Sequence, residues 1–186
     1  MTASCAQPVH GNTPYFWHVA SDLPIDNNLP RAERLRALEA PLEALLRGED
    51  SGWANLANIS AALMSASAWH WVGFYIVDRS QDNLVLGPFQ GPIACTRLFK
   101  GKGVCAAAWQ EGRIQVVPDV DSFPGHVACS SASKSEVVLP ITSKEGLVVA
   151  VLDIDSAVAD DFEPAEIEAL KSLVEMVSSK WDQWTW

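Results

Sequence analysis

The chain has 186 residues, of which 48% are hydrophobic and 19% are charged, a composition typical of a folded globular domain. Its net charge of -10 argues against nucleic acid or an anionic membrane surface as a partner, because both are bound through clustered Lys and Arg. No apolar stretch approaches the roughly 20 residues of a membrane helix, and the N-terminus lacks a basic-then-apolar signal pattern. We therefore expect an intracellular, cytoplasmic protein, in which clustered cysteines are more often catalytic or metal-binding than disulfide-forming.

The N-terminal third predicts an arm followed by two helical regions. Residues 1–28 are polar and rich in Pro, and we expect them to form an extension. Residues 31–47 have leucines at spacings of three and four, which predicts a helix that is interrupted near Pro41 and ends at Gly48. Ser51 is expected to cap the next helix. Its predicted apolar face consists of Trp53, Leu56, Ile59 and Leu63.

The middle of the chain predicts strands. Residues 69–78 are apolar on both faces, with Trp71, Tyr75 and Val77 on one and Val72, Phe74 and Ile76 on the other, which indicates a sheet covered on both sides. Further strands are predicted at residues 83–89, 93–99, 114–117, 136–141 and 147–154, the last two as a hairpin.

Two helices and a long loop complete the expected elements. A short helix is predicted from residue 103 to 110, ending at Gly112. Residues 119–135 are polar and rich in Gly and Ser, which predicts a long loop of the type that often carries functional residues. Pro164 opens a final helix. Its buried stripe is predicted to consist of Ile167, Leu170, Val174 and Val177. Short connections and terminal helices predict an α+β fold of three layers with an antiparallel sheet, spanning residues 29–186 as one domain.

Three cysteines stand out from the predicted core. Cys95, Cys105 and Cys129 are spaced by ten and then twenty-four residues, and none forms a C-x-x-C pair, so neither a zinc ribbon nor a thioredoxin-type motif is present. Gly, Ser, His or Lys residues flank each of them. A low-pKa thiol requires backbone amides, partial exposure and nearby positive charge, so the leading hypothesis is thiol redox chemistry.

Seven short motifs, from about residue 53 to the C-terminal helix, resemble the free methionine-(R)-sulfoxide reductases, enzymes built on a GAF domain. They are WVGFY from Trp71, LVLGPFQG from Leu84, IAC from Ile93, GVC from Gly103, HVAC from His126, SEVVLP from Ser135 and VLDIDS from Val151. Each is weak alone, but their order is specific. The resemblance implies a GAF fold, with the terminal helices on one face of the sheet and loops with a short helix over a ligand pocket.

The resemblance also implies a reaction and its residues. The reaction would be reduction of the R-sulfoxide of free methionine with thioredoxin as electron donor, and it would need neither a cofactor nor a metal. Cys129 would be the nucleophile, Cys95 the resolving thiol and Cys105 a secondary or relay thiol. The carboxylates that match the family's catalytic and substrate-binding positions are Glu136, Asp153 and Asp155, and the matching aromatic contacts are Trp71 and Tyr75.

The chemistry of these residues fits that reaction. A sulfoxide is a poor electrophile until its oxygen is protonated or hydrogen-bonded, so an acid such as Glu136 is needed beside the thiolate. Attack by Cys129 would leave a sulfenic acid, which Cys95 would capture as a disulfide. Asp153 and Asp155 are two residues apart on a predicted strand and share a face, where the α-ammonium of a free amino acid would relieve their repulsion.

Simpler interpretations exist for the same residues. Cys105 lies beside Val104 and three alanines and could be an inert core residue. Without the resemblance, Asp153 and Asp155 could mark an ordinary strand end, Glu136 could be a solvated strand end, and Trp71 and Tyr75 could be plain core.

Two other functions also remain open. A GAF sensor could bind a small ligand without chemistry, although it would not need three cysteines. A structural metal site could use Cys95, Cys105, Cys129 and His126, although the paired spacing typical of such sites is missing. Homodimerisation through the terminal helices is a further open possibility.

Overall fold

The computed structural model describes residue 23, residues 25–125 and residues 130–186. Its centre is a six-stranded sheet in the order β3-β2-β1-β6-β5-β4, in which every neighbouring pair is antiparallel. The strands are β1 (Trp71–Asp78), β2 (Asn83–Gln90), β3 (Arg97–Phe99), β4 (Gln115–Val117), β5 (Ser135–Thr142) and β6 (Val148–Ser156). The predicted antiparallel α+β fold is therefore confirmed.

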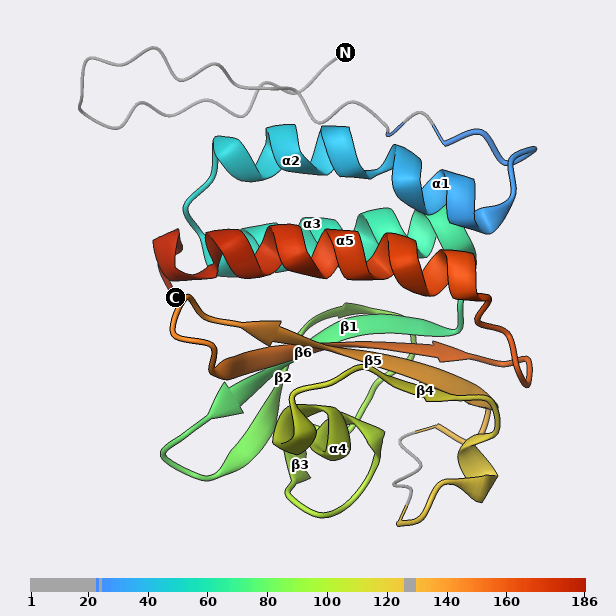
Figure 1. The fold of residues 1–186 in the computed structure, drawn as a ribbon, viewed down its shortest axis with the longest axis vertical. Helices are drawn as coiled ribbons and strands as arrows, with labels where there is room; N and C mark the ends of the chain where they lie inside the picture. Colours follow the sequence, from blue (N-terminus) through green and yellow to red (C-terminus); the bar gives the residue numbers. More distant parts are fainter. Residues whose placement is uncertain (1–22, 24, 126–129) are drawn as a thin grey trace.

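Helices cover the two faces of the sheet unequally (Figure 1). On one side, α3 (Gly52–Ser67) and α5 (Pro164–Lys180) pack against the sheet, and α1 (Arg31–Ala37) and α2 (Glu39–Arg47) form a further layer over these two helices. The other face carries the short helix α4 (Val104–Glu111) and the loops around it, including the 3-10 turn η1 (Val120–Ser122). A second 3-10 turn, η2 (Trp181–Gln183), follows α5. No helix in the described part of the chain is long and apolar enough to cross a membrane.

Strand β1 separates two hydrophobic cores, as its sequence predicts. Val72 and Phe74 point into the larger core under α3 and α5, whereas Trp71 and Tyr75 point into a smaller core under α4. All four side chains are buried. Because successive side chains of a strand point to opposite faces, this one strand supplies both cores.

The helices confirm most of the predicted boundaries. The first helical region breaks at Leu38, between α1 and α2, because Pro41 has no N–H to donate to the carbonyl of Ala37. Ser51 caps α3 by accepting a hydrogen bond from the Ala54 backbone at 3.4 Å. Gly112 ends α4 in the left-handed conformation.

Three predicted details are wrong or only partly right. Trp53 is not on the buried face of α3: it is 46% exposed and meets Trp186 edge-on. Ile167 is only partly buried, at the edge of the α5 stripe. The strand predicted over residues 93–99 is reduced to β3, and the residues before it form a loop.

Arg31 joins helix α1 to the opposite end of the chain. Its guanidinium pairs with Glu166 at 2.7 Å and Asp161 at 3.1 Å, and lies 5.2 Å from the centre of the Trp69 ring. Asp161 also accepts a 2.6 Å hydrogen bond from the Ser156 hydroxyl at the end of β6. The first helix, the exit of β6 and the start of α5 are thereby held together.

Candidate active site

The site contains two rows of residues that lie side by side across strands β1, β6 and β5. In the first row, Trp71 of β1 pairs with Asp155 of β6, which pairs in turn with Glu136 of β5. In the next row, Asp153 takes the central place, opposite Gly73. Residues two apart on a strand share a face, so all of these positions face the α4 side of the sheet, where Trp71 is packed.

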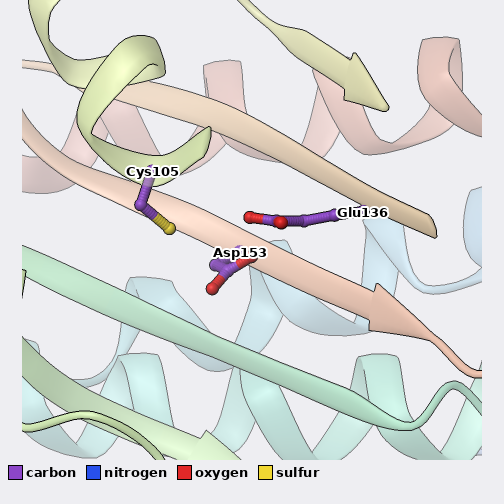
Figure 2. A group of neighbouring side chains, drawn as sticks. All are labelled: Cys105, Glu136 and Asp153. Carbon is purple, nitrogen blue, oxygen red and sulfur yellow. The ribbon is translucent and has the colours of Figure 1, made fainter. Parts of the chain in front are cut away.

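A thiol and two carboxylates converge beneath α4 (Figure 2). Cys105 points down from α4 towards Glu136 and Asp153, and their ligand atoms lie within 4.8 Å of one another. The side chains are only 4% to 6% exposed. They line a cleft together with Asp155, Lys102 and other residues of the α4 and β3 regions. The structure thus brings together three predicted carboxylates and one predicted thiol.

Burial and mutual repulsion favour the protonated forms of these side chains when no cation is bound. The pKa of Glu136 is raised well above its usual range by burial first, and then by the charges of Asp153 and Asp155. Burial and the charge of Asp155 likewise raise the pKa of Asp153. The pKa of the Cys105 thiol is raised by burial and by the neighbouring carboxylates. These surroundings are the reverse of the positive ones that favour a thiolate, so Cys105 is a protonated thiol in this state.

Asp153 has an additional feature that favours a cationic ligand. Its buried Oδ1 atom accepts no hydrogen bond from the described residues. A buried carboxylate oxygen without a donor is costly, and an ammonium group or a metal ion would satisfy it. Cys105, Glu136 and Asp153 form the group of described residues that could hold a metal ion. The four-ligand set considered from the sequence is not testable here, because His126 and Cys129 lie outside the described residues.

A wall of stacked aromatic rings lies in the smaller core next to the site, and neither Trp71 nor Tyr75 is among the described residues that line the cleft. The Trp71 ring stacks on Phe89 at 5.4 Å and on Tyr75 at 6.0 Å between centroids. Gly73 makes room for it, because a Cβ atom there would meet the Trp71 ring at 2.5 Å and Phe89 at 2.4 Å. A side chain at this position would displace the wall, so glycine is required by the packing.

The same two aromatic residues hold the loop that carries Cys95. The Tyr75 hydroxyl donates a 2.9 Å hydrogen bond to the Cys95 carbonyl. The Trp71 indole N–H donates a 3.1 Å hydrogen bond to the carbonyl of Pro92. Cys95 is half-buried and packs against the smaller core. The backbone around the predicted resolving thiol is therefore held by hydrogen bonds from the two aromatic side chains.

Several residues of the site were not anticipated from the sequence. Ser130 and Ser133 line the cleft, and His70 Nε2 lies 3.0 Å from the Ser130 hydroxyl. The His70 backbone also donates a 2.9 Å hydrogen bond to the carbonyl of Asp155. The one signal that pointed towards the serines was their place in the polar segment that follows the HVAC motif. The predicted nucleophile Cys129 lies outside the described residues.

The sequence of this chain is similar to those of several known proteins. A family profile described as a GAF domain matches residues 56–179. "GAF domain-containing protein A" of Dictyostelium discoideum is 50% identical over 106 residues, covering 57% of this chain and 66% of that protein. A free methionine-R-sulfoxide reductase of Saccharomyces cerevisiae is 36% identical over 119 residues, covering 58% of this chain and 63% of the yeast protein. The chain thus spans just under two thirds of these curated relatives.

Solved structures extend the similarity over more of the chain. The free methionine-R-sulfoxide reductase of Neisseria meningitidis, in complex with its substrate, superposes with a TM-score of 0.80 at 42% sequence identity. The superposition covers 83% of this chain and 92% of the Neisseria chain. A fold, and not only a set of motifs, is therefore shared.

Proposed function

The chain belongs to the GAF domain family and groups there with the free methionine-R-sulfoxide reductases, and we propose that it has this activity. The observation that carries the proposal is the buried acidic group of Glu136 and Asp153 beside the Trp71 wall. It offers a proton and a place for a cation within one cleft. Free methionine sulfoxide combines a basic oxygen, an α-ammonium group and an apolar S-methyl group, and therefore matches all three features.

Glu136 is the acid of the proposed reaction. Its raised pKa favours the protonated form, which can donate a hydrogen bond to the sulfoxide oxygen. Proton donation makes the sulfur electrophilic, and the Cys129 thiolate attacks it. The attack forms a transient bond between the two sulfur atoms. The protonated oxygen is then transferred to the Cys129 sulfur as the S–O bond of the sulfoxide and the sulfur–sulfur bond break, so that methionine leaves and Cys129 becomes a sulfenic acid. The substrate sulfur gains the two electrons that the cysteine sulfur loses.

Two further thiol steps return the enzyme to its starting state. The Cys95 thiol attacks the sulfenic sulfur of Cys129, forming a disulfide, and its proton leaves with the sulfenic hydroxyl as water. Thioredoxin then exchanges its own dithiol for this disulfide. Cys105 serves as a secondary thiol. Cytoplasmic thiol reductants would support this cycle, and we place the protein there. Dimerisation through the terminal helices stays a prediction.

Asp153 and Asp155 explain why the amino acid must be free. They are proposed to hold the α-ammonium, which satisfies the unpartnered oxygen of Asp153. N-acetylation removes the positive charge and leaves the buried carboxylates facing a neutral amide. A buried charge left without a partner costs several kcal/mol, so N-acetylated methionine sulfoxide should lose about 100-fold or more in kcat/KM.

The test measures the methionine that the unsubstituted protein and its variants form from each substrate, with dithiothreitol as reductant. The unsubstituted protein should reduce free methionine-R-sulfoxide and leave the N-acetylated form largely untouched. Cys129→Ser should abolish methionine formation even in a single turnover, because a hydroxyl is a far weaker nucleophile than a thiolate. Cys5→Ser is the matched control and should remain active. Equal use of free and acetylated substrates, or a normal single turnover by Cys129→Ser, would contradict the proposal.

A further inference from the structure

Two large apolar side chains that flank Cys95 in the sequence project into solvent. Ile93 is 91% exposed, the highest value among the large hydrophobic residues that the structure describes, and Phe99 is 60% exposed. Ile93 belongs to the loop between β2 and β3, and Phe99 ends β3 itself. Strand β3 is an outer strand of the sheet, so a second protein can approach it from the side (Figure 1).

The exposure of Ile93 occurs on a backbone that is firmly held. The loop is anchored from inside at Pro92 by the Trp71 indole and at Cys95 by the Tyr75 hydroxyl. At its end, the Leu86 backbone N–H donates a 3.0 Å hydrogen bond to the Thr96 carbonyl. A loop held at three points presents its apolar side chain in one place, which reduces the entropy lost when a partner binds.

The charge of this region differs from that of the whole chain. Residues 91–110 contain three basic residues and no acidic residue, although the net charge of the chain is -10. Arg97 and Lys100 pair with Asp78 and Asp82, and both basic side chains remain about half exposed. An acidic partner would therefore be repelled less here than by the average surface of the protein.

We propose that Ile93 and Phe99 form the docking surface for the protein dithiol that reduces the Cys95 disulfide. This inference rests on the proposed function, in which Cys95 is joined to Cys129. A thiolate of the partner forms a bond to the Cys95 sulfur, and Cys129 leaves as a thiolate. The second thiol of the partner then displaces Cys95, so that the partner is oxidised to its disulfide and both cysteines are reduced. The partner is a thioredoxin-type protein with an apolar rim around its dithiol and acidic groups outside that rim.

The experiment separates docking from chemistry by using two reductants. Turnover of free methionine-R-sulfoxide is measured with thioredoxin, kept reduced by its reductase and NADPH, and separately with dithiothreitol. The double variant Ile93→Ser/Phe99→Ser should raise the KM for thioredoxin about tenfold or more, because two apolar contacts are lost. Its rate with dithiothreitol should stay within about twofold of the original, because a small reductant needs no docking surface. Leu147→Ser, at an exposed apolar position in the β5–β6 hairpin, is the matched control and should change neither rate.

Each other outcome has a definite meaning. An unchanged KM for thioredoxin in the double variant would overturn the docking surface, and so would an equal loss of turnover with both reductants. Turnover of the unsubstituted protein with dithiothreitol but not with thioredoxin would also overturn it, while the sulfoxide chemistry would stand. If the unsubstituted protein forms no methionine with either reductant, the proposed function fails and the docking surface fails with it.

Discussion

At the scale of single residues, Tyr75 has two tasks that can be separated. Its ring is part of the aromatic wall, and its hydroxyl holds the Cys95 carbonyl. The ring is the predicted aromatic contact of the substrate, whereas the hydroxyl, through the Cys95 carbonyl, would act on the step in which Cys95 captures the sulfenic acid. Tyr75 is thus a positioning residue for that step.

Tyr75→Phe removes the hydroxyl and keeps the ring. We expect the first methionine per enzyme to form at a nearly normal rate, because the wall is retained. Disulfide formation should slow about fivefold, in keeping with the roughly 1 kcal/mol that one hydrogen bond contributes. Rapid quenching followed by thiol counting would measure both steps.

Cys95→Ser is the reference for this measurement. It should release about one methionine per enzyme and then stall with thioredoxin as the donor. If disulfide formation in Tyr75→Phe is as fast as in the unsubstituted protein, the hydroxyl does not position Cys95. Undiminished thioredoxin-driven turnover by Cys95→Ser would instead show that Cys95 is not the resolving thiol.

Residue-level prediction from the sequence worked where spacing alone decides geometry. Asp153 and Asp155 are two apart on a strand, and the structure places both in the cleft, as the spacing predicts. The pairing of Asp155 with Glu136 depends on the register between β5 and β6, which no local pattern encodes. The acidic surroundings of Cys105 were missed for the same reason, because they come from strands that follow it by more than thirty residues.

At the scale of secondary-structure elements, the periodicity of apolar residues located the helices and most strands. It did not show which apolar residues are exposed at the edge of the sheet. The apolar residues of the 93–99 segment suggested a longer strand, yet Ile93 and Phe99 face solvent. A short pattern cannot distinguish an apolar residue that is buried from one that projects outward. The prediction for Trp53 was wrong for a similar reason. Its spacing fits the buried face of α3, but its ring turns towards Trp186.

Arg31 links secondary-structure elements that are far apart in the sequence, and its substitution should lower the free energy of unfolding. Arg31→Met removes the cation from a partly buried group and leaves Glu166 and Asp161 without it. Breaking one side of a buried ion pair typically costs about 3–5 kcal/mol, and breaking an exposed pair costs less than about 1 kcal/mol. Because this group is partly buried, we expect the free energy of unfolding to fall by about 2 kcal/mol.

Denaturant unfolding followed by circular dichroism would measure this loss. The control is Arg47→Met, which removes an exposed pair with Glu43 at 3.3 Å and should cost less than about 0.5 kcal/mol. A loss for Arg31→Met as small as that of the control would mean that the link between α1, β6 and α5 contributes little.

At the scale of the whole molecule, the buried carboxylates make stability depend on pH. A group whose pKa is higher in the folded than in the unfolded protein binds its proton more tightly when folded. Its stabilising contribution is therefore complete below the ordinary pKa and is lost as the pH rises through the raised one. For Glu136 the loss begins above its ordinary value of 4.5, and Asp153 acts in the same direction.

Glu136→Gln should remove much of this dependence, because the amide has nearly the same shape and carries no charge. Without substrate, the melting temperature of the variant relative to the unsubstituted protein should rise as the pH increases from about 4.5 to 8. Each unit by which the pKa is raised corresponds to about 1.4 kcal/mol. Thermal unfolding at a series of pH values would measure the difference, and a difference independent of pH would contradict the prediction.

The row of Trp71, Asp155 and Glu136 across three strands also bears on handedness. The sulfur of a sulfoxide is pyramidal and carries an oxygen, a methyl group, the rest of the molecule and a lone pair in four directions. If the ammonium end is held by the aspartates, the acid and the aromatic wall fix two more directions on a rigid sheet. The mirror-image sulfur would then have to turn its oxygen away from Glu136 or its methyl group away from the rings. Chirality at sulfur would thus be discriminated by the pairing of backbone strands, which a side-chain rotamer change cannot invert.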